Sequence, residues 1–112
     1  MSELNNYISE FLKALSDQTR LDILFLLQKE TRTSSDLQEI LQKSQSTISQ
    51  HLKILLTNNL ISFEKKDKEN LYSIKDLETS NFLTEISSFV IRRNKEKLED
   101  FIDSDIRDVL PL

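Results

Sequence analysis

A helix over residues 45–57 would carry the polar side chains whose types and spacing best fit a chemical task, hydrogen bonding to DNA bases. At about 100° of rotation per residue and with Ile48 directed inward, one side of this helix collects polar residues. Gln and Ser can hydrogen-bond base edges, whereas acidic groups would be repelled by phosphate, and no Asp or Glu lies between residues 40 and 63. The alternative is an ordinary solvated helix face. The outward residues are Ser46, Ser49, Gln50, Lys53 and Thr57.

The first turn of the same helix adds to this prediction. The N-terminus of a helix offers free backbone N–H groups, which are suited to binding phosphate. With the first turn included, the residues of this segment predicted to contact DNA are Ser44, Gln45, Ser46, Thr47, Ser49, Gln50 and Lys53.

The composition excludes most other chemistries. The 112 residues include no Gly, no Cys and one His. Without Cys there is no disulfide, thiolate metal site or thiol redox switch, and without Gly there is no phosphate-binding Gly-rich loop. A single His cannot form a multi-His metal site. The serines near His51 point away from it on one helix, so the sequence predicts no enzyme, no cofactor and no metal site.

The single histidine, His51, has three possible roles. It lies about 60° from the inward direction of the helix, on its shoulder, where it could be half-buried and pack against the preceding helix. It could instead contact a phosphate or a base. Metal binding or catalysis is the third alternative, and the lack of a His or Cys companion disfavours it.

Local signals place the elements that must position these residues. Asp17, Thr33 and Ser44 are good N-caps, and Asp36 stands where a capping box needs an acidic partner for Thr33. Asn58-Asn59 can end a helix because Asn tolerates the left-handed conformation. Apolar spacing predicts helices over residues 3–15, 18–29, 34–42 and 45–57, and the helix over 18–29 should be central and buried.

The second half of the chain begins with a hairpin. Alternating apolar residues predict strands over 60–65 and 71–74, joined by a polar tip over 66–70 in which Asn70 could supply a turn conformation. Helical spacing resumes at about residue 77 and continues, beyond a polar patch at 92–95, to Ile106. In the short helix predicted over residues 34–42, Ile40 is expected to face inward. The predicted fold class is mainly α with a small β-hairpin, in the order α-α-α-α-β-β-α, as one domain over residues 1–112.

A helix-turn-helix followed directly by a hairpin is the winged helix-turn-helix arrangement. Two stretches of this part of the chain are distinctive, residues 15–24 (LSDQTRLDIL) and residues 44–55 (SQSTISQHLKIL). They resemble the L-S/A-D-P-T-R-L-x-I-L segment, with Gln18 where Pro is usual, and the S-Q-S-T-V-S-x-H-L-K-x-L recognition helix of the ArsR family of dimeric transcriptional repressors. The resemblance spans roughly residues 8–92 and implies a DNA-binding role.

The resemblance also implies functions for the hairpin and for the terminal helices. In that family the hairpin touches the minor groove or flanking phosphates, which makes Lys65, Lys66 and Lys68 candidates, although interleaved acids favour a solvated turn as the alternative. The family dimerises through its terminal helices, and the apolar stripes here are broad. The predicted interface residues, which could instead complete the core, are Leu4, Tyr7, Phe11, Phe82, Ile86, Phe89 and Val90.

The chain departs from the metal sensors of the resembled family. One type of sensor uses Cys on the helix before the recognition helix, and that helix here has none. Another uses Asp and His pairs on the last helix, which here lacks His. The resemblance therefore implies the DNA reader without the metal sensor, and it leaves open an unknown small-molecule or protein effector.

The charge distribution agrees with binding through one local face. The chain carries a net charge of −4, but residues 28–75 carry eight basic and six acidic side chains, a net +2. We therefore predict a cytoplasmic homodimeric repressor of operator DNA, with no membrane segment or signal peptide. The alternative is a winged helix used for protein–protein contact in a transcription or replication assembly.

Overall fold

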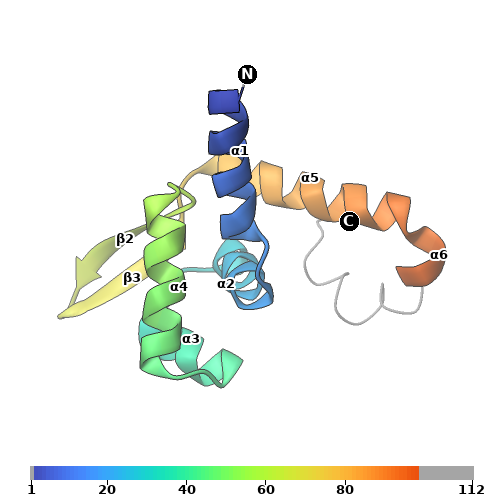
Figure 1. Ribbon diagram of the computed structural model, residues 1–112. Helices are drawn as coiled ribbons and strands as arrows, with labels where there is room; N and C mark the ends of the chain where they lie inside the picture. The colour runs from blue at the N-terminus through green and yellow to red at the C-terminus, as the bar shows by residue number, and fades with distance from the viewer. Residues whose placement is uncertain (1, 99–112) are drawn as a thin grey trace. The chain divides into compact units, whose positions relative to one another are not determined.

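The computed structural model describes residues 2–98, which form two compact units, residues 2–75 and residues 76–98. The first unit contains helices α1 to α4 and a small sheet, and the second contains α5 and α6 (Figure 1). None of the described helices is long and apolar enough to cross a membrane.

The boundaries of the first two helices agree with those predicted, 3–15 and 18–29, to within one residue. Helix α1 is Ser2–Leu15, and α2 is Gln18–Lys29, whose N-cap Asp17 accepts a hydrogen bond from the backbone N–H of Arg20. Helix α2 contacts α1, α3, α4 and strand β3, as predicted for a central helix. Its buried residues Ile23, Leu24 and Leu27 form the middle of the core.

Helices α3 and α4 form the predicted helix-turn-helix. Helix α3, Ser34–Leu41, begins with a complete capping box between Thr33 and Asp36, and α4, Gln45–Thr57, begins after its N-cap Ser44. The prediction that Ile40 faces inward was wrong, since this side chain is 46% exposed. Leu37 alone satisfies the inward face of so short a helix, and it is fully buried.

The sheet has three strands, one more than expected. Strands β2, Ile61–Lys66, and β3, Glu69–Ile74, form the predicted antiparallel hairpin. Strand β2 lies one residue later than expected, β3 begins two residues earlier, and the loop is only Asp67-Lys68. The additional strand β1, Arg32–Thr33, pairs with the other side of β3, so the strand order is β1-β3-β2. Two residues are too few to show an alternating pattern, which is why the sequence gave no signal for β1.

Within residues 2–98, four non-glycine residues adopt positive φ where many chains would use glycine. Asn59 does so directly after α4, at 58°, as predicted for a helix end. Gln42 does so at the end of α3, and Asp67 and Lys68 do so in the hairpin loop. The expectation for Asn70 was wrong, because Asn70 lies within β3 opposite Lys65.

The second unit is helical from the predicted start. Asp76 caps α5, Leu77–Arg93, by accepting a hydrogen bond from the Thr79 backbone N–H at 2.8 Å. The predicted continuous helix is interrupted at Asn94, whose backbone and side chain both bond Val90 O, and α6 is Lys95–Leu98. The part of the prediction beyond residue 98 lies outside the described residues.

Candidate nucleic-acid interface

Helix α4 has one buried face and one polar exposed face, as its sequence predicted. Ile48, Leu52 and Leu55 are buried, and Leu55 and Ile48 are fully so. This packing fixes which way the helix turns its polar side. The predicted contact residues on its exposed side are Gln45, Ser46, Ser49, Gln50 and Lys53, while Thr47 is half-buried.

Hydroxyl groups gather at the first turn of α4. Ser44 Oγ accepts the backbone N–H of Thr47 at 3.2 Å, and it donates to Thr47 Oγ1 at 2.9 Å. Ser46 Oγ lies 3.2 Å from Ser44 Oγ. Ser44 is therefore engaged in capping the helix, and Ser46 is the exposed hydroxyl best placed to meet a ligand at this turn.

The last predicted outward residue of α4 is also engaged. Thr57 Oγ1 donates to Lys53 O at 2.8 Å, one turn back along the same helix. Its hydroxyl therefore satisfies a backbone carbonyl, and the amide of Gln50 and the ammonium of Lys53 are the stronger candidates for recognition.

The hairpin presents its three lysines on different sides. Lys65, Lys66 and Lys68 are all exposed. Because side chains alternate along a strand, Lys65 shares a face with Phe63, and Lys66 lies on the opposite face, paired with Glu69. Lys68 is in the loop. The structure therefore does not bring the three lysines together on one surface.

His51 is half-buried, as the first of the three alternatives for this residue predicted. Its side chain is 17% exposed, and its Nδ1 lies 3.1 Å from Arg20 Nη1 and 3.9 Å from Asp17 Oδ2. The neighbouring groups come from the start of α2, whereas the prediction named the preceding helix. The Arg20 N–H bonded to Asp17 lowers the pKa of that carboxyl, and the charge of Arg20 adds to this effect.

Arg20 is a residue that sequence reasoning missed. Its side chain bonds to the last turn of α1 and to His51 of α4. Arg20 and His51 are 31 positions apart in the sequence. The available signal was its place in the family-like segment 15–24, beside the cap residue Asp17.

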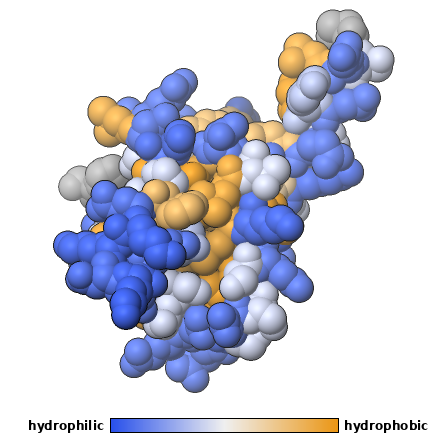
Figure 2. Space-filling model, turned by 90° about the vertical axis from the view of Figure 1, so that its left-hand side faces the viewer, coloured by the Kyte–Doolittle hydropathy of each residue, from blue (hydrophilic) through white to orange (hydrophobic). Residues whose placement is uncertain are grey.

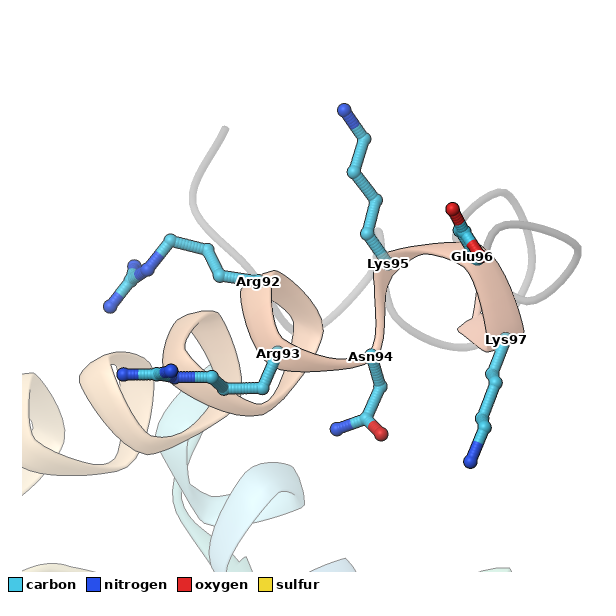
Figure 3. A pocket seen from close by; sticks show the side chains of 6 residues that line it. All are labelled: Arg92, Arg93, Asn94, Lys95, Glu96 and Lys97. Carbon is cyan, nitrogen blue, oxygen red and sulfur yellow. The ribbon is translucent and has the colours of Figure 1, made fainter.

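Two of the surface hollows of the described residues are lined by both acidic and basic side chains, which could hold a polar ligand. One, of about 400 Å³, is lined by residues 92–97 of the second unit. Its side chains splay outward in different directions (Figure 3), Arg92 pairs with Glu85 at 2.9 Å, and Arg93 lies over the Phe89 ring at 4.9 Å. This hollow is therefore not shaped around a common ligand.

The other hollow, of about 280 Å³, lies between α2 and α3. Phe25, Leu26, Ile40 and Leu41 give it an apolar lining, with Asp22 and Lys29 also bordering it. Burial raises the pKa of the Asp22 carboxyl, and the nearby charge of Lys43 opposes this rise. Across residues 2–98, no three His, Cys, Asp or Glu side chains are grouped closely enough to hold a metal ion.

The residues predicted for dimerisation are largely exposed in the separate units. On α1, Leu4 is 58% and Tyr7 72% exposed, and Phe11 is half-buried. The projecting upper end in Figure 2 is the N-terminal part of α1, and hydrophobic side chains lie on it beside hydrophilic ones. On α5, Phe82, Phe89 and Val90 are exposed and Ile86 is half-buried.

Comparison with known proteins identifies relatives of this arrangement. The family described as "Bacterial regulatory protein, arsR family" matches residues 17–62, from the cap of α2 into β2. The arsenical resistance operon repressor of Bacillus subtilis (strain 168) is 40% identical over 96 residues, which are 85% of this chain and 91% of that repressor.

Solved structures show the same fold. A crystal structure from Mycobacterium tuberculosis gives a TM-score of 0.80 at 23% identity, covering 85% of this chain and 96% of that one. The homodimeric winged helix-turn-helix DNA-binding domain of a Mycobacterium bovis protein, solved by NMR, gives 0.72 at 20% identity, covering 83% and 84%. The fold, the helix-turn-helix match and the identity to the Bacillus repressor together show that the chain belongs to the arsR family of bacterial regulatory proteins.

Proposed function

We propose that the chain is a homodimeric transcriptional repressor that binds operator DNA by placing α4 in the major groove. The observation that carries this proposal is the exposed, polar face of α4, held outward by the buried residues Ile48, Leu52 and Leu55. No acidic residue lies between residues 40 and 63 to oppose phosphate. Occupying a promoter in this way would block transcription.

The side chains of α4 divide into base-reading and phosphate-binding groups. The amides of Gln45 and Gln50 can pair with the N6 and N7 positions of adenine, and the hydroxyls of Ser46 and Ser49 can bond to several base edges. Lys53 supplies a cation for guanine or for phosphate. The free N–H groups at the start of α4, with Ser44 and Thr47, suit a phosphate of the same half-site.

A dimer would present two copies of α4 to two half-sites. Two-fold symmetry places recognition helices about 34–36 Å apart, one turn of DNA. The exposed apolar residues of α1 and α5 named above supply the interface in this proposal. Lys65, Lys66 and Lys68 would contact flanking phosphates, and their placement on different sides limits how many can do so at once.

The chain is assigned the repressor role of its relatives, but it is not assigned a metal sensor built from Cys thiolates. The chain has no Cys and a single His, so it cannot build the soft-ligand sites that select thiophilic metals and metalloids. Release from DNA would require a different effector, and the described residues give no assignment for it.

Binding to DNA from upstream of the chain's own gene tests this function. Fluorescence anisotropy with labelled upstream duplexes should show binding that weakens as salt rises, because lysines displace counterions from phosphate. A scrambled duplex of equal composition should bind more weakly. If no upstream or genomic fragment shows salt-sensitive binding at low ionic strength, the repressor assignment is wrong. Gln50→Ala and Lys53→Ala distinguish this function from a protein-contact role, because loss of DNA binding with partner binding intact would exclude the protein-contact role.

A further inference from the structure

One arginine side chain connects the end of α1 to the recognition helix. The Arg20 guanidinium donates from Nε to Ala14 O at 2.7 Å and from Nη2 to Lys13 O at 3.0 Å, both in the last turn of α1. Its third nitrogen, Nη1, lies 3.1 Å from Nδ1 of His51 in α4. Every nitrogen of the planar guanidinium therefore has an acceptor, and three helices meet at this one group.

Arg20 is itself held in place at the start of α2. Its backbone N–H donates to Asp17 Oδ2 at 3.0 Å, and the same oxygen lies 3.9 Å from His51 Nδ1. Lys13 O, which also accepts the backbone N–H of Ser16 at 3.2 Å, and Ala14 O are carbonyls of the last turn of α1, so the guanidinium also closes the end of this helix. We call Asp17, Arg20 and His51 the Arg20 network.

The contact with Arg20 assigns an acceptor role to Nδ1 of His51. A guanidinium can only donate hydrogen bonds, so Nδ1 must accept in this contact. A proton on Nδ1 would remove this acceptor and place a second cation against Arg20. The charged groups that face the ring are Arg20 and the carboxylate of Asp17, both from the start of α2.

We propose that Arg20 is a positioning residue that fixes the orientation of α4 relative to α1 through its hydrogen bond to His51. This inference rests on the function proposed above, in which α4 reads DNA and α1 contributes to the dimer. The apolar contacts of Ile48, Leu52 and Leu55 are non-directional, whereas a hydrogen bond fixes an angle. His51 directly follows Gln50, so a rotation of α4 that breaks this bond also turns the reading face.

Three variants separate the hydrogen bond from charge and from packing. His51→Asn retains an acceptor oxygen near the place of Nδ1, and His51→Leu retains bulk without an acceptor. Arg20→Lys retains the charge but replaces the planar guanidinium, whose three nitrogens each face a different acceptor, with one compact ammonium. Relative to wild type, operator affinity should fall about tenfold in His51→Leu and Arg20→Lys and stay within about twofold in His51→Asn.

The salt dependence of binding provides a readout that loss of a phosphate contact would not reproduce. The slope of log affinity against log salt should be unchanged in His51→Leu, because no phosphate contact is removed. Because His51→Asn restores an acceptor without the imidazole ring, recovery of affinity in that variant assigns the effect to the hydrogen bond.

The upstream duplex bound by wild-type protein serves as the probe, and circular dichroism selects a temperature at which each variant is folded. Failure of wild type to bind overturns the proposed function and not this inference alone. If wild type binds and Arg20→Lys and His51→Leu bind equally well, or if His51→Leu reduces the salt slope, the positioning role is wrong. If His51→Leu does not fold, Arg20→Lys decides, and an operator affinity of that variant within about twofold of wild type overturns the proposal.

Discussion

The exposed side of α4 combines two kinds of polar group whose contributions to DNA binding can be measured separately. Gln50 offers an amide, which discriminates between bases because it pairs with adenine through two hydrogen bonds. Lys53 offers a positive charge, which attracts the phosphate of any sequence. Both side chains are exposed on a helix whose other face is buried, so their removal should leave the fold intact.

Truncation of these two residues should therefore have different signatures. Gln50→Ala should weaken operator binding by about 1–3 kcal/mol and relax base preference at one position, with an unchanged salt dependence. Lys53→Ala should weaken binding to all duplexes and lower the salt slope by about 1. Anisotropy titrations at several salt concentrations measure both effects, with Lys29→Ala on α2 as the charge-matched control. Equal, sequence-independent losses for both variants would contradict base reading by Gln50.

Asp17 should contribute a stability that depends on pH. Its pKa is lowered in the folded protein, chiefly by the Arg20 N–H, so its carboxylate stabilises the fold above the ordinary pKa of 3.8. That stabilisation is lost as pH falls through the lower, folded value. Asp17→Ala should cost about 1 kcal/mol at pH 7, as loss of an N-cap does, and less near pH 3.

Urea unfolding at both pH values tests this expectation. Glu10→Gln, on the exposed side of α1, serves as the control for general charge effects. An Asp17→Ala penalty that is equal at pH 7 and pH 3 would show that the carboxylate charge is not responsible.

The orientation of α4 could be predicted from sequence, whereas the Arg20 network could not. Helical periodicity alone determines which residues of α4 share a face with Ile48. The contact between Arg20 and His51 depends on how two helices cross, and nothing local in the sequence encodes that crossing. The alternating pattern of the hairpin strands was visible in the sequence, but the length of the loop was not. The sequence therefore placed Lys66 in the loop, and only the strand register shows that Lys66 lies in β2, on the opposite face from Lys65.

At the scale of the elements, helix boundaries were predictable wherever a cap residue marked them. Helices α2 and α4 begin directly after Asp17 and Ser44, as expected for side chains that accept first-turn N–H groups. Strand β1 has neither a cap nor a pattern, and it exists because β3 offers it a free edge. The interruption at Asn94 was likewise unmarked by proline or glycine.

Residues that adopt positive φ more readily should stabilise the hairpin loop and so raise the free energy of unfolding. Asp67 and Lys68 both have positive φ in a two-residue loop, as a type I′ turn requires. Asp67→Asn with Lys68→Gly should raise stability by about 0.5–1 kcal/mol, because these residues adopt positive φ at lower cost. Urea unfolding measures this change. Lys68→Gln is the control that removes the charge without relieving the backbone, and a double variant no more stable than this control would contradict the turn assignment.

At the scale of the whole molecule, a chain with a net charge of −4 must bind DNA through a restricted surface. The central segment 28–75, which includes α4 and the hairpin, carries the positive balance, and the terminal segments carry the negative one. A net +2 per chain is small, so a dimer that doubles the number of phosphate contacts is important for affinity.

Disruption of the proposed dimer should therefore also weaken DNA binding. Tyr7→Glu, at an exposed position on α1, should raise the dimer dissociation constant by roughly tenfold or more, since an aromatic anchor of an interface is worth about 2 kcal/mol. Ile40→Glu is the control, because Ile40 is an exposed apolar residue outside the predicted interface. Analytical ultracentrifugation reports the association, and an unchanged dimer in Tyr7→Glu would exclude this part of α1 from the interface.

The central claim is that α4 enters the major groove of the operator. It can be tested by attaching a DNA-cleaving reagent to α4 and mapping where the DNA is cut. The chain contains no Cys, so Gln50→Cys creates a single attachment point for an iron chelate, and Glu10→Cys on α1 provides the control. We predict that the chelate at position 50 cuts upstream DNA at two symmetric sites about one helical turn apart, and that the control does not. Binding without cleavage from position 50, or an identical pattern from position 10, would contradict the account.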